Sequence, residues 1–213
     1  MKGEHVVTTS AEVRSLDLST MTAADTEFSS AEFLLTARAD GRRGDEPDDA
    51  VKAGRGEGAT GLTQDSAGAG AAGATRGGVE AGTGAGDGPV MCYGVVLWFD
   101  TAFSARFCEE EAVVLSTSPY ARPTHWSQTM LHFPEPIALA PAAGAGGGVQ
   151  GAGGVGEGAV GSRGNPAAAI KVRVSMAKCA EEIRARALDI SLEFTAVSSG
   201  GKEGPHNAKI YQM

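Results

Sequence analysis

The pattern of apolar and polar residues along the chain is that of β-strands. Residues 170–176 (Ile-Lys-Val-Arg-Val-Ser-Met) alternate strictly, as a strand with one buried face requires. Residues 188–194 repeat the alternation, and residues 93–99 are apolar on both faces, which indicates a strand buried on both sides. Shorter apolar runs at 13–18 and 33–35 add weaker strands. The pattern predicts an all-β fold, a small barrel or sandwich of roughly six to eight strands.

Two glycine-rich ranges interrupt this pattern. Residues 40–88 hold 15 of the 31 glycines, and residues 141–165 hold 11. Their low hydrophobicity leaves too little apolar surface to offset the entropy lost on ordering. We therefore expect both ranges to be disordered surface insertions in a single β-barrel domain spanning residues 1–213.

Three other segments carry patterns that could be taken for sites. Residues 151–156 match G-x-G-x-x-G, but no apolar strand leads into them and no helical pattern follows, so we interpret the match as chance in a glycine-rich tract. The glutamate clusters at 109–111 and 181–182 lie at hairpin-like junctions and are predicted to be solvated turns. Residues 180–186 are compatible with a helical turn or a charged hairpin loop.

Charge and cysteine content narrow the class of protein. The formal net charge is −8. Residues 40–88 carry nine acidic and five basic side chains, so this range contributes half of that net charge. A mildly acidic chain fits basic protein substrates better than nucleic acid, and it fits an ordinary solvated surface as well. Three cysteines, Cys92, Cys108 and Cys179, form no C-x-x-C pair, so neither a metal site nor a disulfide framework is expected. With no signal-peptide or membrane-spanning pattern, we expect a protein of the cytoplasm or nucleus with no membrane contact.

The best candidate site is the stretch 116–129, Ser-Thr-Ser-Pro-Tyr-Ala-Arg-Pro-Thr-His-Trp-Ser-Gln-Thr. It lies between two segments of strand character, and its prolines and hydroxyl residues favour turns. His125 and Trp126 stand side by side where the chain leaves the turn. Loops held by a rigid scaffold are where binding and catalytic side chains are usually presented.

This stretch resembles the threonine-histidine-tryptophan loop of the type I protein arginine methyltransferases, which lies in the C-terminal β-barrel domain of that family. The segments 26–35, 94–103, 170–176, 188–194 and 211–213 resemble the barrel strands around the loop. The resemblance implies a protein that transfers a methyl group from S-adenosylmethionine to arginine side chains of proteins. It also implies roles for three residues: His125 closes the substrate-arginine pocket and bonds to acidic groups of another domain, Trp126 shapes the pocket wall, and Thr124 fixes the turn.

The resemblance covers only the barrel. In the family a Rossmann-type domain binds the cofactor and supplies paired glutamates, and neither that domain nor the glutamate loop is found in this sequence. We therefore expect this chain to contain no catalytic or cofactor-binding residue, to be inactive alone, and to need such a domain in cis or in trans. The family's dimerisation arm precedes the point at which the chain begins, so homodimers are expected only through segments absent here. The family usually has lysine at the position of Ser127.

Several alternatives stay open. His125 is also compatible with bonding to its own loop backbone, and Trp126 with a role as a buried anchor. His132 lies six residues beyond His125, on the same strand face if one strand runs unbroken between them, and is interpreted as structural. For the whole chain, the alternative function is a non-catalytic β-sandwich interaction module derived from the same family. An upstream cofactor domain would decide between the two, and exposed interdomain apolar surface is expected to make the isolated chain associate.

Overall fold

The protein is an antiparallel β-sandwich with almost no helix. The computed structural model describes residues 2–38, 67–75, 88–103, 112–140, 158–179 and 187–213. Within these ranges are two short 3-10 helices and ten strands: η1 Gly3–His5, β1 Val6–Leu16, η2 Ala23–Thr26, β2 Phe28–Thr36, β3 Ala67–Thr75, β4 Val90–Trp98, β5 Asp100–Phe103, β6 Val113–Ser116, β7 Thr129–Leu139, β8 Ala169–Lys178, β9 Leu188–Val197 and β10 Glu203–Gln212. The all-β prediction is confirmed, with more strands than expected.

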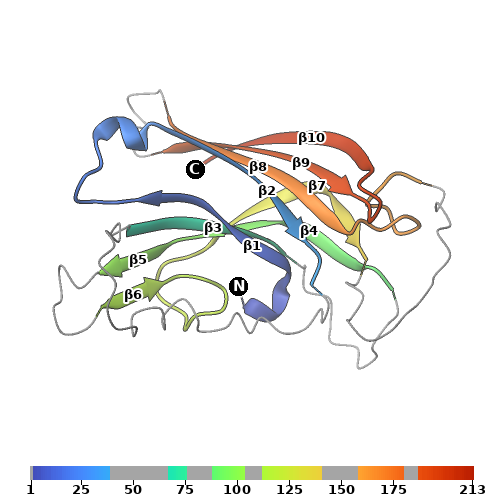
Figure 1. Cartoon of the computed structure of the whole chain (residues 1–213), viewed down its shortest axis with the longest axis horizontal. Helices are drawn as coiled ribbons and strands as arrows, with labels where there is room; N and C mark the ends of the chain where they lie inside the picture. The colour runs from blue at the N-terminus through green and yellow to red at the C-terminus, as the bar shows by residue number, and fades with distance from the viewer. Residues whose placement is uncertain (1, 39–66, 76–87, 104–111, 141–157, 180–186) are drawn as a thin grey trace, which may run out of the picture.

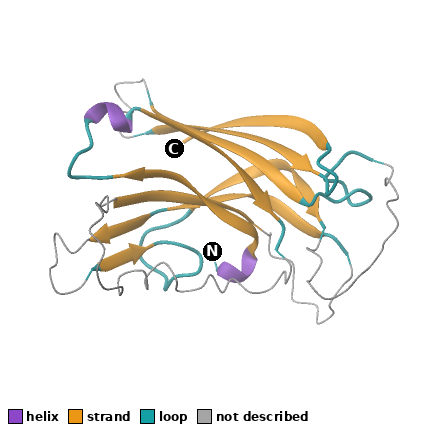
Figure 2. Ribbon diagram, viewed as in Figure 1, coloured by secondary structure: helices purple, strands orange, loops and turns teal. Residues whose placement is uncertain are grey.

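The strands form two four-stranded sheets and a separate hairpin. The first sheet has the order β1-β3-β4-β7, the second sheet has the order β10-β9-β8-β2, and the hairpin pairs β5 with β6. Figure 1 shows the two sheets as stacked layers, with β5 and β6 on the outer side of the first sheet. Figure 2 shows how little helix accompanies them. The hydrophobic core lies between the two sheets.

The second sheet follows the alternation in its sequence. On β8, Ile170, Val172 and Val174 are fully buried, whereas Lys171 and Arg173 point to the outer face. The β8–β9 pairing runs without a register shift, and so does the β2–β8 pairing. Because side chains alternate between faces along a strand, each uninterrupted pairing keeps all of its apolar positions in the core.

The first sheet is buried on both faces along β4, as the apolar run predicted. Val95 belongs to the core between the sheets. Val96 and Trp98 are also buried, but Trp98 meets the ring of Tyr120 on the other side, edge to face with centroids 6.4 Å apart. A strand covered on both sides has no solvent face. The first sheet is therefore a middle layer, with the second sheet on one side and the chain around Tyr120 on the other.

A bulge interrupts the pairing of β4 with β7. Cys92 stands opposite Ile137, but Gly94 stands opposite His132, so the chain between these two β7 residues loops out. The carbonyl of His132 accepts hydrogen bonds from the Tyr211 hydroxyl and, at 3.4 Å, from Lys209 Nζ. These contacts attach β10 of the second sheet to β7 of the first. Burial raises the pKa of Tyr211, which keeps its hydroxyl protonated and able to donate.

Both glycine-rich ranges contain ordered structure that the sequence did not predict. Within residues 40–88, expected to be a disordered insertion, Ala67–Thr75 form β3 between β1 and β4. Residues 141–165 were likewise expected to be disordered. Residues 158–165 instead form a turn that buries Val160 and uses positive φ at Gly158 and Gly161. The composition of a segment indicates only how much apolar surface it can bury. These two stretches also have backbone hydrogen-bond partners in neighbouring strands and turns, which composition does not reveal.

Several predictions fall outside the described residues: the 109–111 and 181–182 glutamates, the 151–156 motif, Cys108, the 180–186 connection, and the remainder of the two glycine-rich ranges. Cys92 and Cys179 are buried thiols. In the described part of the chain, no group of three or more His, Cys, Asp or Glu side chains is placed to hold a metal ion. The helices described there are too short and too polar to cross a membrane.

Candidate functional site

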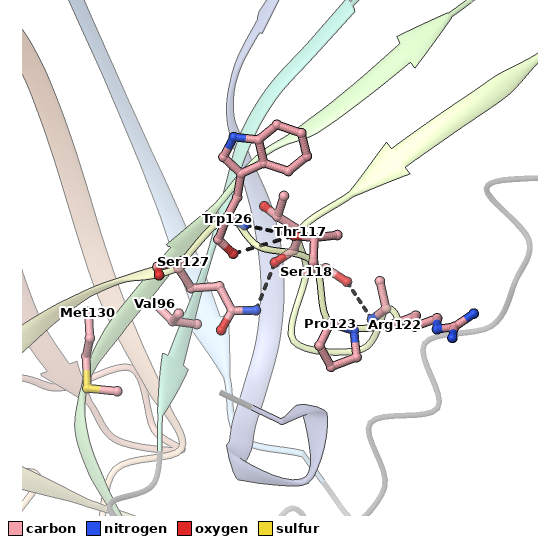
Figure 3. Close-up of a pocket in the computed structure, with 11 residues that line it drawn as sticks. Val96, Thr117, Ser118, Arg122, Pro123, Trp126, Ser127 and Met130 are labelled. Carbon is pink, nitrogen blue, oxygen red and sulfur yellow. Dashed lines mark hydrogen bonds between the residues drawn. The ribbon is translucent and has the colours of Figure 1, made fainter.

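The candidate loop connects β6 to β7 and lies over the outer face of β4. β6 ends at Ser116 and β7 begins at Thr129, so the predicted loop between two strands is confirmed. Figure 3 shows the loop residues together with Val96 of β4 and Met130 of β7, which form the floor beneath them. The middle-layer position of the first sheet is what gives the loop a rigid base.

One end of the loop is fixed by the buried Thr117. Its hydroxyl donates to the carbonyl of Phe99 at 2.7 Å and accepts the amide of the same residue at 3.0 Å. Its own amide also donates to the Phe99 carbonyl, at 3.0 Å. From the far end of the loop, Gln128 Nε2 donates to the Thr117 carbonyl at 2.8 Å. Entry and exit are therefore tied together at one point, which limits how far the loop can move.

Tyr120 fixes the first half of the loop. Its ring packs on Trp98, and its hydroxyl accepts a hydrogen bond from Arg38 Nη1 at 3.1 Å. The Arg38 guanidinium also lies over the ring, 5.9 Å from the centroid. Before it, the Ser118 hydroxyl accepts the amides of Tyr120 and Ala121, which closes a serine turn. The sequence predicted only that this stretch contains turns. Hydroxyl residues and aromatic packing determine its conformation.

The Thr124-His125-Trp126 tripeptide lies at the surface end of the loop. The Thr124 hydroxyl accepts the Trp126 amide at 3.3 Å, so Thr124 does shape the turn. The rings of His125 and Trp126 stack with centroids 3.8 Å apart, and Trp126 meets Phe99 edge to face at 6.0 Å. His125 is exposed and Trp126 is 44% exposed. The two rings therefore lie against each other at the surface, tilted by 33°.

A cavity of about 470 Å³ lies under the loop, and this volume is within the range of small-ligand sites. Thr124 and Trp126 line it, and His125 does not. In Figure 3 the guanidinium of Arg122 extends away from the other labelled residues. The full lining is Val96, Thr117, Ser118, Ala121, Arg122, Pro123, Thr124, Trp126, Ser127, Gln128 and Met130.

The charge of this cavity limits its chemistry. Among the described residues, its lining includes hydroxyls, one amide and the Arg122 guanidinium, but no carboxylate. Such a cavity can position a side chain through shape and hydrogen bonds. It cannot neutralise a cationic guanidinium or accept a proton from one, because both tasks need a nearby anion or base. Any such group has to come from outside the loop.

The structure does not meet the condition under which His125 and His132 would share a strand face. β7 begins only at Thr129, so no strand runs unbroken from His125 to His132. His132 is exposed on β7, and the contacts that attach β10 use its carbonyl. Trp126 is half exposed, so the reading of it as a buried anchor is wrong.

Sequence reasoning missed the residues that hold the loop in place. Arg38 is 82 residues from Tyr120 in the sequence. Phe99 and Val96 were predicted only as part of a buried strand. Thr117 and Gln128 lay inside the quoted loop but carried no sign of their pairing across it. The signal that could have marked Thr117 is a hydroxyl residue directly after an apolar strand. Many strands are followed by a hydroxyl residue. The pattern identifies a loop anchor only when the partner of the hydroxyl, here the backbone of Phe99, is known.

Comparison with known proteins identifies the family. The family model described as "Arginine methyltransferase oligomerization subdomain" matches residues 1–146, which include β1, β2, β4 and the complete loop. The chain belongs to the arginine methyltransferase family. The resemblance carried by the loop and the flanking strands is thereby confirmed at the level of the family.

Among the arginine methyltransferases most similar in sequence are two plant proteins. "Probable protein arginine N-methyltransferase 3" of Arabidopsis thaliana is 46% identical over 123 residues, which are 58% of this chain and 19% of that protein. The protein of the same name from Oryza sativa subsp. indica is 42% identical over 126 residues, 59% of this chain and 18% of that protein. The matched part of the chain thus spans less than a fifth of either relative.

Solved structures agree on the architecture. The "Trypanosoma brucei PRMT1 enzyme-prozyme heterotetrameric complex with AdoHcy" covers the whole chain with a TM-score of 0.53 and 20% identity, and the match takes in 42% of that polypeptide. Protein arginine methyltransferase 10 of Arabidopsis thaliana also covers the whole chain, with a TM-score of 0.54, 13% identity and 40% of its own length. At these identities the likeness establishes the fold, that of the arginine methyltransferase barrel region.

Proposed function

We propose that this chain is the barrel part of a type I protein arginine N-methyltransferase and supplies one wall of the substrate-arginine pocket. The observation that carries the proposal is the Thr124-His125-Trp126 loop, which is fixed at both ends and presents two stacked, solvent-facing rings beside a cavity. A rigid loop that presents exposed aromatic rings is suited to complete a site shared with another domain.

In this proposal each loop residue has a separate role. Thr124 holds the turn through the Trp126 amide, and Trp126 forms the wall against which the arginine stem lies. His125 is exposed and does not line the cavity, and in this proposal it meets acidic groups of the second domain. Methyl transfer breaks the sulfur–methyl bond of S-adenosylmethionine, forms a nitrogen–methyl bond on the guanidinium and releases one proton. The loop helps to orient the substrate guanidinium for that step, and such orientation lowers the activation barrier.

The cofactor belongs to another domain in this proposal. The described residues that line the loop cavity include no carboxylate that could hold ribose hydroxyls or align a guanidinium, so they do not fit S-adenosylmethionine. A Rossmann-type domain, in cis or in trans, would bind the cofactor and supply the paired glutamates. The chain alone is then inactive. Its partners are that domain and arginine-containing protein substrates, in the cytoplasm or nucleus.

The test is a His125→Ala substitution in the barrel assembled with a cofactor domain, with His132→Ala as the matched control. We expect His125→Ala to lower the rate of methyl transfer to a protein substrate at least about tenfold. Binding of S-adenosylhomocysteine should stay within twofold of the unsubstituted enzyme. His132→Ala should leave both quantities unchanged, because the contacts of His132 that hold β10 use its carbonyl.

Unchanged turnover in the His125→Ala enzyme would remove His125 from the pocket. If no cofactor domain restores methyl transfer to the barrel, the proposal fails, and the non-catalytic interaction module becomes the better description. In that case a protein partner should still bind the chain, and substitution of the exposed Trp126 should weaken the complex.

A further inference from the structure

The N-terminal turn η1 lies directly against the candidate loop. It spans Gly3–His5 just before β1, and Figure 1 shows it on the side of the first sheet where β6 also lies. A Cβ at Gly3 would stand 2.5 Å from Cδ1 and 3.0 Å from Cε1 of Tyr120. It would also stand 3.4 Å from the carbonyl oxygen of Pro119. The lack of a side chain at residue 3 therefore lets the backbone of η1 pack on the Tyr120 ring.

The Tyr120 ring has little room to move away from η1. The buried Trp98 of β4 meets it edge to face, with the centroids 6.4 Å apart and the planes at 86°. Arg38, which follows β2, donates from Nη1 to the Tyr120 hydroxyl at 3.1 Å. Residues from three separate segments, η1, the end of β2 and β4, thus contact one ring.

Arg38 and η1 belong to one connected part of the fold. The amide of Arg38 donates to the carbonyl of Val7, near the start of β1, at 3.0 Å. The residues beside them, Thr8 and Ala37, form an antiparallel bridge, and Thr8 is fully buried. The start of β1 and the end of β2 therefore hold the backbone from which the Arg38 side chain reaches the Tyr120 hydroxyl.

Tyr120 connects this part of the fold to the Thr124-His125-Trp126 tripeptide. Its amide donates to the Ser118 hydroxyl at 3.3 Å, so its backbone belongs to the turn in the first half of the loop. The hydrogen bond from Gln128 to the Thr117 carbonyl closes the loop at its base. A displacement of Tyr120 within this closed loop is passed on to the tripeptide, because the base of the loop is fixed and packed protein transmits strain.

We propose that Gly3 and Tyr120 are positioning residues for methyl transfer. η1 sets the place of the Tyr120 ring, and the ring sets the place of the Thr124-His125-Trp126 tripeptide. Neither Gly3 nor Tyr120 lines the loop cavity, so both act through the loop. This inference rests on the proposed function, because it concerns the position of the same pocket wall.

The distances at Gly3 indicate how large the effect of a side chain there is. Carbon atoms in contact are about 3.5–4.0 Å apart, so a methyl group 2.5 Å from Tyr120 Cδ1 requires a shift of about 1 Å. A misplacement of about 1 Å in a group that positions a substrate lowers a rate about a hundredfold. η1 contains no buried residue and takes up part of the shift, so we expect a loss of about tenfold.

The first test is Gly3→Ala in the barrel assembled with a cofactor domain. We expect kcat for methyl transfer to a protein substrate to fall at least about tenfold. Binding of S-adenosylhomocysteine, which counts the folded sites, should stay within about twofold of the unsubstituted enzyme. The matched control is Gly200→Ala, where the atom nearest to the new Cβ, Ser198 Oγ, is 4.0 Å away, and its kcat should not change. An unchanged kcat in Gly3→Ala would overturn the proposal.

A double-mutant cycle tests whether η1 acts through the Tyr120 ring. Tyr120→Ala should lower kcat at least about tenfold, and adding Gly3→Ala should change it less than about twofold, because no ring is left to displace. Tyr120→Phe keeps the ring, so Gly3→Ala should again lower kcat at least about tenfold in that background. If the losses from Gly3→Ala and Tyr120→Ala multiply in the double variant, η1 acts by another route and the proposal is wrong.

Hydrogen exchange of the 213-residue chain tests the coupling without any methyl transfer. In both Gly3→Ala and Tyr120→Ala, the amides of residues 118–127 should exchange at least about tenfold faster, whereas those of β8 and β9 should keep their protection. Unchanged exchange at 118–127 would overturn the proposal. A loss of protection that extends equally to β8 and β9 would overturn it too, because the two residues would then support the whole fold and not the loop.

The two measurements separate this inference from the proposed function. If His125→Ala leaves methyl transfer unchanged while exchange at 118–127 responds to Gly3→Ala, the proposed function fails and the coupling between η1 and the loop stands. If His125→Ala lowers methyl transfer while Gly3→Ala changes neither kcat nor exchange, the proposed function stands and Gly3 and Tyr120 are not positioning residues.

Discussion

The two sheets of this sandwich differ in how regularly their strands pair. In the second sheet, strands β8 and β9 pair over their whole length without a register shift, β2 pairs with β8 in the same way, and a register shift occurs only between β9 and the edge strand β10. The first sheet has register shifts in the β1–β3 and β4–β7 pairings and a glycine-alanine strand at its centre. Regular alternation thus stabilises one sheet almost strand by strand, whereas the other depends on a few specific contacts.

The outer faces of the sheets differ as well. The outer face of the second sheet carries charged side chains, where Arg173 Nη2 and Nε both donate to Glu32 Oε2, at 2.6 and 3.1 Å. The outer face of the first sheet is covered by the loop that contains Thr117 and Tyr120. The irregular sheet is therefore the one that presents the candidate site, and the regular sheet supports it from behind.

The largest effect is expected from Leu192→Ala in the regular sheet. Leu192 is fully buried in the core, so removing its side chain should lower the free energy of unfolding by about 3 kcal/mol in urea denaturation. The control is Leu188→Ala on the same strand, where the side chain is 38% exposed and the loss should stay below about 1 kcal/mol. Equal losses would mean that the second sheet does not depend on its alternating core positions.

Gly94→Ala tests the dependence of the first sheet on one close approach. A Cβ at this position would lie 2.3 Å from the Leu131 carbonyl oxygen and 3.0 Å from His132 Cα, so β4 and β7 would have to separate. We expect a loss of about 1–3 kcal/mol in thermal unfolding. Gly88→Ala, whose Cβ would meet nothing within 4 Å, should leave Tm unchanged. A neutral Gly94→Ala would show that the bulge can relax at no cost.

Thr117→Val tests how the site is attached to the irregular sheet. The substitution keeps the shape of the side chain but removes the hydroxyl that bonds to both the amide and the carbonyl of Phe99. Loss of these buried bonds should lower stability by about 1–2 kcal/mol in urea. Thr117→Ser keeps the hydroxyl and should recover most of that loss. If serine behaves like valine, methyl packing and not hydrogen bonding fixes the loop.

Glu32→Gln should have the smallest effect, visible only in the pH dependence of Tm. The hydrogen bond from Arg173, helped by the charge of Lys171, lowers the pKa of Glu32 below its usual value of 4.5. A carboxylate with a lowered folded-state pKa stabilises the fold above its unfolded-state pKa, and this contribution disappears as the pH falls through the folded-state pKa. Between about pH 5 and pH 3, Tm should therefore fall more steeply for the original chain than for Glu32→Gln.

The control for this measurement is Glu12→Gln, at an exposed position of β1. It should keep the steep acid slope of the original chain. A Glu32→Gln variant with that same slope would show that the charges on the outer face of the second sheet are fully screened by solvent.

The sequence alone determined the elements that a short pattern of neighbouring residues can specify. Alternation at 170–176 and 188–194 fixed strands β8 and β9 and their buried faces, because a half-buried strand needs one apolar side at every second residue. The apolar run at 93–99 fixed β4 as a strand covered on both sides. Turn residues and the threonine-histidine-tryptophan order are enough to locate the candidate loop and to indicate the family.

Only the tertiary structure decided the features that depend on distant partners. β3 forms because β1 and β4 both need a hydrogen-bonded neighbour, a requirement that the composition of residues 67–75 does not record. The loop takes its shape from Phe99, Arg38 and the bond between Gln128 and Thr117, which join segments far apart in sequence. Local patterns report which face of a strand is apolar, whereas the partner of a backbone amide or a hydroxyl is set by which segments the fold brings together.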